Sequence, residues 1–152
     1  MVSAARLLER RNSPVRFQFI GDGPEKQALI QLAAGLKTVV FNDPVPKAEI
    51  PARMAQADAI LLSLRDVPLF RYGVSPNKLY DAYAIGRPVI TTVAGSINAE
   101  VETHRLGVTA EPGDPRALAD AILRLAKTPR AEREAMAERA TQLAHSTYSR
   151  QR

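Results

Sequence analysis

Hydrophobic residues follow two different periods along this chain, and the places where the period changes predict its elements. Across residues 15–20 every second position is apolar, which is the period of a half-buried strand. Residues 58–64 are almost continuously apolar, which is typical of a strand that is covered on both faces of a parallel sheet. Leu118, Ile122 and Leu125 are separated by four and then three residues, which is the period of a helix with one buried face.

The same patterns, together with glycine and proline positions, predict an alternation of helices and strands along the whole chain. Strands are predicted at 15–20, 38–41, 58–64, 89–93 and 107–110. Helices are predicted at 2–10, 25–35, 49–57, 76–85, 115–128 and 131–144, with a short helical turn at 100–103. This alternation is typical of an α/β fold: a Rossmann-like parallel sheet with helices on both faces, formed by residues 1–152 as a single domain.

The stretch 74–93 carries the first indication of a binding site. Ser75 is predicted to cap a helix whose first position is Pro76, where the missing N–H costs nothing. Gly86 is predicted to end that helix in a left-handed conformation. The free N–H groups of Asn77 and Lys78 would then lie at the positive end of the helix dipole, which favours an anion such as a phosphate.

An acidic residue lies one turn further along the same helix face. Asp81 follows Lys78 by three residues, so the two side chains are neighbours on the helix surface. A carboxylate at this place could bind two hydroxyls of a sugar whose phosphate lies at the helix start. The spacing is equally compatible with a capped surface helix in which Asp81 is solvated or pairs with Lys78.

Composition narrows the kinds of function. The chain has 152 residues, 45% of them hydrophobic and 24% charged, which is ordinary for one globular domain. It has no cysteine, which excludes thiol and disulfide chemistry, and its two histidines, His104 and His145, have no metal-ligand spacing. The net charge is +5, but the basic residues are dispersed among acidic ones and do not alternate with aromatic residues. We therefore expect no nucleic-acid partner. No cofactor is expected either.

Three loops are expected to meet at one edge of the sheet. Residues 21–25, 42–46 and 65–78 each follow a predicted strand, and the carboxyl ends of parallel strands lie at the same edge. Ligands of open α/β sheets bind at that edge, near the point where the strand order reverses. The sequence therefore predicts a binding site formed by these loops.

The order of the motifs resembles a known family. This chain is similar to the carboxyl-terminal, donor-binding half of family 4 glycosyltransferases of the GT-B fold, and most similar to the bacterial subgroup that makes cell-surface polysaccharides. The resemblance covers nearly the whole chain. It is carried by six blocks in the family's order: Gly21-Asp22-Gly23-Pro24-Glu25, Val40 to Pro46, Ala57-Asp58, Ser75 to Asp81, Gly86 to Ile90, and Gly107 with Glu111 to Ala119.

The resemblance implies a role for each predicted site residue. Asp81 stands where the family has an acid that binds the ribose hydroxyls, and Ser75, Pro76, Asn77 and Lys78 stand where the donor diphosphate lies. Lys78 is the candidate catalytic cation, which would stabilise the leaving diphosphate. The nucleotide loop would comprise Gly21 and Gly23, which allow close approach of the nucleotide, and Val45 and Pro46, beside the base.

The implied function is the donor-binding half of a retaining glycosyltransferase. It would transfer a hexosyl or N-acetylhexosaminyl group from a nucleotide sugar, expected to be UDP-linked, to an acceptor that could be lipid-linked. An alternative is an α/β module that binds a nucleotide without turnover. By resemblance the protein is expected to be cytoplasmic. The resemblance is also compatible with a peripheral position at the inner face of the cell membrane.

The chain departs from the family pattern in three respects. Many members have a glutamate eight residues before the ribose acid, where this chain has Gly73, and the acid itself is Asp81 rather than glutamate. The family's amino-terminal acceptor domain and the first, central strand of its donor domain have no counterpart in these residues. We therefore expect an inactive fragment of a two-domain protein, with an imperfect sheet in which strands 15–20 and 59–64 are not directly paired.

Overall fold

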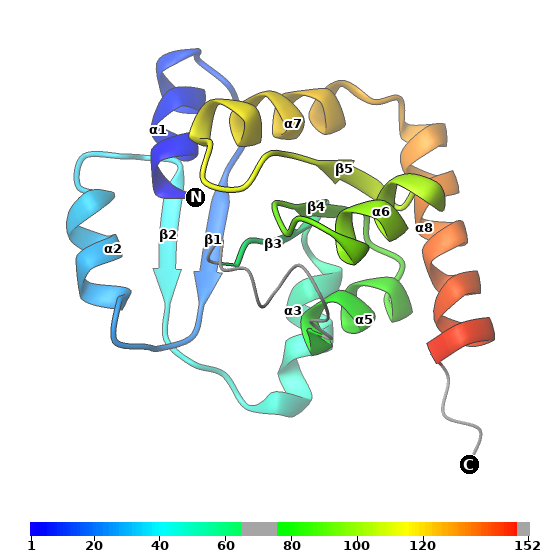
Figure 1. Cartoon of the computed structure of the whole chain (residues 1–152). Coiled ribbons are helices and arrows are strands. Elements are labelled where there is room, and N and C mark those ends of the chain that lie inside the picture. The colour runs from blue at the N-terminus through cyan, green and yellow to red at the C-terminus, as the bar shows by residue number, and fades with distance from the viewer. Residues whose placement is uncertain (65–75, 149–152) are drawn as a thin grey trace.

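The strands form two separate parallel sheets. The structure is a computed structural model that describes residues 1–64 and 76–148 (Figure 1). In the first sheet, β1 (Phe17–Ile20) pairs with β2 (Val39–Asn42). In the second sheet the order is β3 (Ile60–Leu62), β4 (Val89–Thr91) and β5 (Gly107–Thr109), and every pairing is parallel.

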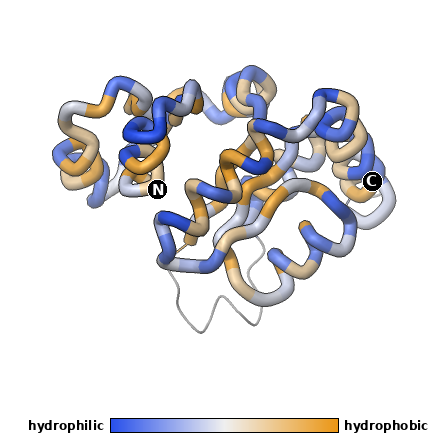
Figure 2. The backbone as a smooth tube through the Cα atoms, turned by 90° about the horizontal axis from the view of Figure 1, so that it is seen from above, coloured by the Kyte–Doolittle hydropathy of each residue, from blue (hydrophilic) through white to orange (hydrophobic). Residues whose placement is uncertain are grey.

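Helices cover both sides of these sheets, so the predicted α/β class is confirmed. Along the chain they are α1 (Val2–Arg10), α2 (Lys26–Leu32), η1 (Lys47–Glu49), α3 (Ile50–Ala55), α5 (Asn77–Ala84), α6 (Ser96–Thr103), α7 (Pro115–Lys127), α8 (Arg130–Leu143) and η2 (Ala144–Tyr148). Figure 2 shows hydrophobic and hydrophilic residues alternating along the helical coils, as expected for helices with one buried face.

Two apolar clusters form the core, one on each side. The cluster under α1 and α7 contains Leu8, Phe17, Ile90 and Leu118, and Leu61 of β3 packs against it. The other cluster lies under α5, α6 and α8 and is built from buried residues of those helices and of β3 and β4. The first cluster contains Phe17 of one sheet and Ile90 of the other, so apolar packing joins the two sheets. No strand pairing joins them within the described residues.

The edges of β1 and β3 are open within the described residues. The N–H groups of Phe17 and Gly21 donate to β2, at Thr38 O (2.7 Å) and Asn42 O (3.3 Å), so Gln18 and Ile20 present their backbone groups at the other edge of β1. On β3, Ile60 N donates to Pro88 O on the β4 side. The prediction that strands 15–20 and 59–64 are not directly paired is therefore confirmed.

Helix boundaries follow local chemistry in two clear cases. The carboxylate of Asp114 accepts hydrogen bonds from Arg116 N (2.8 Å) and Ala117 N (3.1 Å), so Asp114 caps the start of α7. Gly86 has φ of +64° after the last turn of α5, as predicted, and Arg87 N donates to Ala82 O at 3.0 Å.

The predicted strands and helices are mostly longer than the observed ones, and one helix was underestimated. The prediction placed only a helical turn at 100–103, whereas α6 begins at Ser96. Gly95, with φ of +92°, turns the chain directly into this helix. The small residues Ala94, Gly95 and Ser96 are typical of a loop, but Ser96 is already the first residue of α6.

Candidate functional site

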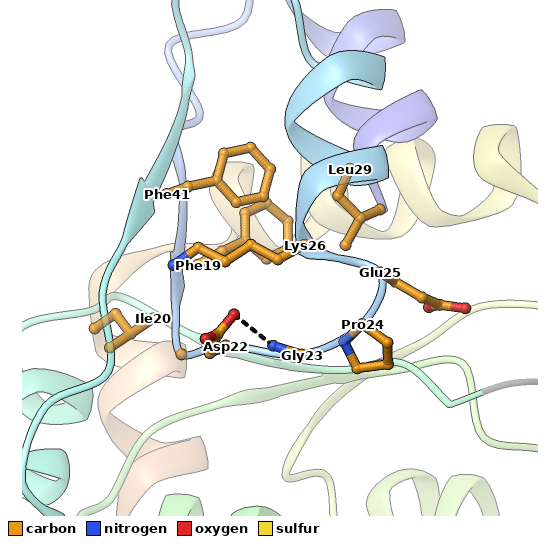
Figure 3. A pocket seen from close by; sticks show the side chains of 10 residues that line it. Phe19, Ile20, Asp22, Gly23, Pro24, Glu25, Lys26, Leu29 and Phe41 are labelled. Atoms are coloured by element: carbon orange, nitrogen blue, oxygen red, sulfur yellow. Dashed lines mark hydrogen bonds between the residues drawn. The ribbon is translucent and has the colours of Figure 1, made fainter.

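A pocket lies at the carboxyl ends of β1 and β2, beside the start of α2 (Figure 3). It encloses about 570 Å³. The rings of Phe19 and Phe41 form an apolar wall, with centroids 5.0 Å apart and planes inclined by 16°, and Leu29 of α2 lies beside them. The loop 21–25 closes the other side. The structure therefore places Gly21 and Gly23, both predicted site residues, in the lining of this pocket.

Polar contacts hold the loop and tie it to the next one. The carboxylate of Asp22 accepts a hydrogen bond from Gly23 N at 2.8 Å, which fixes the turn. The Lys26 ammonium donates to Asn42 O at 3.4 Å and lies 3.1 Å from Asp43 Oδ1. Only 17% of the Lys26 side chain is exposed. The structure thus brings the predicted loops 21–25 and 42–46 together, as expected for one site.

The two glycines of the loop differ in their backbone conformation and in the space around them. Gly21 has φ of +137°, a backbone conformation that side chains with a Cβ rarely adopt. Gly23 has an ordinary φ, and a Cβ built on it meets no atom within 4 Å. A side chain at position 23 would therefore meet no described part of the chain. The open space beside the Gly23 backbone allows a ligand to approach it.

The predicted start of α5 is wrong by one position. Pro76 is the N-cap residue, in an extended conformation, and the helix begins at Asn77 rather than at Pro76. The predicted cap, Ser75, lies outside the described residues, as do Gly73 and most of the loop 65–78. The amides of Asn77 and Lys78 still lie in the first helical turn, where no preceding turn supplies a carbonyl acceptor. The anion site at this helix start therefore stays a prediction.

Lys78 and Asp81 lie on the exposed side of α5, whereas Leu79, Ala82 and Tyr83 are buried. Both are described residues, and they form no ion pair with each other. Partial desolvation of the Lys78 ammonium by the surrounding protein lowers its pKa below the ordinary value. The alternative in which Asp81 pairs with Lys78 is therefore wrong for this structure. The carboxylate of Asp81 is exposed to solvent, where a ligand can reach it.

The structure does not bring all predicted site residues into one pocket. Val45 and Pro46 follow β2, with Val45 half-buried, and neither lines the hollow beside Phe19. The start of α5 is not part of its lining either. Phe41 and Lys26 were not predicted as site residues. The strand period indicated only that Phe19 would face inward, and nothing in the pattern distinguished a core aromatic from one lining a pocket.

Two features are absent from the part of the chain that the structure describes, a metal-binding cluster and a membrane-spanning helix. Among residues 1–64 and 76–148, no cluster of three or more histidine, aspartate and glutamate side chains could hold a metal ion. In the same part of the chain, no helix has the length and apolar character needed to cross a membrane.

Comparisons with known proteins agree on the family. The model of the family described as "Glycosyl transferases group 1" matches residues 1–128. The chain is 32% identical to the amylovoran biosynthesis glycosyltransferase AmsK of Erwinia amylovora, over 83% of this chain and 32% of that protein. A second relative, from Escherichia coli K12, is 26% identical, and the chain covers 38% of it. The chain thus spans about a third of the length of these curated relatives.

Solved structures show the same fold. The carboxyl-terminal domain of the group 1 glycosyltransferase LpcC from Francisella tularensis has a TM-score of 0.74 at 21% identity, over 99% of this chain and 77% of that one. Anabaena HepE, solved in complex with UDP and glucose, has a TM-score of 0.72 at 19% identity, over 97% of this chain and 48% of that one. With the family match over most of its length, this chain belongs to the group 1 glycosyl transferases.

Proposed function

We propose that this chain is the donor-binding half of a retaining glycosyltransferase that uses a nucleotide sugar, expected to be UDP-linked. The observation that carries the proposal is the start of α5. There, the first-turn amides of Asn77 and Lys78, which have no side-chain cap among the described residues, lie one turn from the exposed carboxylate of Asp81. A diphosphate needs donors and positive charge, and a ribose needs a carboxylate that accepts from its hydroxyls.

The chemistry assigned to these residues is electrostatic. The leaving nucleoside diphosphate carries negative charge that develops as the sugar departs, so fixed N–H dipoles and a cation lower the barrier. The Lys78 ammonium supplies that cation, and together with the amides of α5 and the residues Ser75 and Pro76 before it, it would hold the diphosphate. Asp81 orients the ribose. The base would lie beside Val45 and Pro46, close to the glycines of the loop 21–25.

The relatives support a place in cell-surface polysaccharide synthesis. AmsK is named for amylovoran biosynthesis, and HepE was solved with UDP and glucose. We propose that this chain works with an amino-terminal acceptor domain in a two-domain enzyme, on an acceptor that is lipid-linked at the inner face of the cytoplasmic membrane. A turnover assay with several nucleotide sugars tests whether this chain is one half of the enzyme, because a half without its acceptor domain should transfer no sugar. Robust transfer by the 152-residue chain would contradict its role as one half of the enzyme.

The nucleotide site is tested by calorimetric titration with UDP. We expect Asp81→Ala to weaken UDP binding by about 10- to 100-fold, because a hydrogen bond to a charged group contributes roughly 1.5–3 kcal/mol. Asp58→Ala is the matched control, since Asp58 is also exposed but precedes β3, at the opposite edge of the sheet. Absence of UDP binding by the unchanged chain, or equal losses in the two variants, would contradict the proposed site.

A second prediction concerns Gly23. Gly23→Ala should change the free energy of unfolding by less than about 0.5 kcal/mol, as an exposed substitution without strain does. The same methyl group should weaken UDP binding by about tenfold if the nucleotide lies against this backbone, because added volume in a filled site costs about 1–3 kcal/mol. Urea unfolding and calorimetry on the same sample provide the two values. Unchanged affinity would remove the loop from the site.

A further inference from the structure

The far end of α5 is held by a shared carboxylate. Tyr83, which has no exposed surface, donates a hydrogen bond from its hydroxyl to Glu100 Oε1 of α6 at 2.9 Å. The hydroxyl of Tyr148, the last residue of η2, donates to the other oxygen of the same carboxylate, Oε2. Glu100 is half-buried, and its carboxylate joins α5, α6 and η2.

The tyrosine rings pack around this carboxylate. Tyr80 lies one turn before Tyr83 on α5, and its ring centroid is 4.4 Å from that of Tyr148. The centroids of Tyr83 and Tyr148 are 6.4 Å apart. Burial, followed by interactions with Glu100, raises the pKa of both Tyr83 and Tyr148 above the ordinary range of a phenol. Both hydroxyls therefore remain protonated donors across the physiological pH range.

Among the described residues, no comparable anchor holds the opposite end of α5. Pro76, at the N-cap, provides no side-chain hydrogen bond to the helix. The helix has eight residues, and Asn77 lies six residues from Tyr83, which is about 9 Å along the axis. In so short and rigid an element, any tilt or rotation at Tyr83 moves the amides of Asn77 and Lys78. The anchor at Tyr83 thus sets where those amides point.

We propose that Glu100 is a positioning residue for the nucleotide-binding helix α5, and that through Glu100 the turn η2 is coupled to nucleotide affinity. The inference rests on the proposed function, in which the start of α5 binds the diphosphate. Glu100 itself is placed on α6 and reaches α5 through the Tyr83 hydroxyl. Its effect on the nucleotide is therefore indirect and geometric.

The chain provides a matched control on the same helix. Glu102 lies two residues after Glu100 on α6 and also accepts a hydroxyl hydrogen bond, from Thr109 of β5. It has no described contact with α5. Glu102→Ala therefore removes a carboxylate and a hydrogen bond from α6 while leaving the Tyr83 anchor in place.

The experiment compares UDP affinity by calorimetry for the unchanged chain, Glu100→Ala, Glu100→Gln and Glu102→Ala. We expect Glu100→Ala to weaken binding by about tenfold, since small misplacements of binding groups have effects of this size or larger. Glu100→Gln should restore affinity to within about threefold, because the amide still has an acceptor oxygen for one tyrosine and a donor for the other. Glu102→Ala should bind as the unchanged chain does. Equal losses for Glu100→Ala and Glu102→Ala, or no loss in either, would overturn the proposal.

A second measurement keeps the inference separate from the proposed function. Hydrogen exchange of the α5 amides is followed without nucleotide in the same variants and in Tyr148→Phe. We expect faster exchange across α5 in Glu100→Ala and a smaller increase in Tyr148→Phe, with no change in Glu102→Ala. If the unchanged chain does not bind UDP, the proposed function fails, and the exchange data alone decide on the anchor. Unchanged α5 exchange in Glu100→Ala would overturn it in either case.

Discussion

Replacing Gly107 with alanine is expected to abolish stable folding of the β3–β4–β5 sheet. A Cβ built on Gly107 would lie 1.8 Å from Val89 O and 2.6 Å from Val89 N, in the backbone of the central strand β4. Ordinary carbon–oxygen contacts are about 3.3 Å or longer, so one of the two strands would have to move by more than about 1 Å. The contact is with backbone rather than with a flexible side chain, so a change of rotamer offers no relief.

The cost of that movement follows from the pairing. Val89 is the register partner of Gly107, and Val89 N donates to Leu106 O at 3.0 Å. Displacing β5 would break this ladder and open the clusters above and below it. We expect a loss of more than about 4 kcal/mol, in the range reserved for severe single substitutions. Urea denaturation of Gly107→Ala measures it, and soluble yield and circular dichroism report the outcome if the variant does not fold.

Gly23→Ala is the matched control for this substitution. Both changes add one methyl group to a glycine without a left-handed φ, but a Cβ on Gly23 meets nothing within 4 Å. Neither site therefore has the left-handed φ that disfavours a side chain, and the expected difference between the variants comes from steric contact. If Gly107→Ala were as stable as Gly23→Ala, the close approach of β4 and β5 at Val89 would be wrong.

Replacing Leu8 with alanine is expected to release the β1–β2 sheet from the rest of the domain. Leu8 lies on α1, is 1% exposed and belongs to the cluster shared by Phe17 of β1 and Ile90 of β4. Truncating a fully buried leucine costs about 2–5 kcal/mol, from lost transfer free energy and the cavity left behind. Because no strand pairing joins β1 to β3 in the described chain, this packing is what connects the two sheets.

Hydrogen exchange distinguishes local release from general weakening. In Leu8→Ala we expect the amides of β1 and β2 to lose more protection than those of β4, since the second core cluster does not include α1. Leu32→Ala is the matched control, because Leu32 is 50% exposed on α2 and should cost little. Equal loss of protection in β1 and β4 would show that the two sheets unfold as one unit, contrary to this prediction.

The candidate site and the anchor of α5 show which features local sequence patterns can predict and which they cannot. A glycine-rich turn after a strand was enough to predict the loop that lines the pocket, because turn chemistry is local. The partners of Glu100 were beyond prediction: Tyr83 is 17 residues away and Tyr148 is 48 residues away. Nothing in the spacing of these residues brings two hydroxyls onto one carboxylate. Only the packing of α5, α6 and η2 does so.

The sequence by itself determined the α/β class, the order of elements, and the local features set by single residues. Asp114 and Gly86 are examples, since a cap or a left-handed turn depends on neighbours a few residues away. The resemblance predicted that β1 and β3 would not pair directly. The tertiary structure alone decided that one apolar cluster joins the two sheets, and that Gly107 touches the backbone of Val89. Both depend on contacts between distant segments, which the periods of hydrophobic residues do not encode.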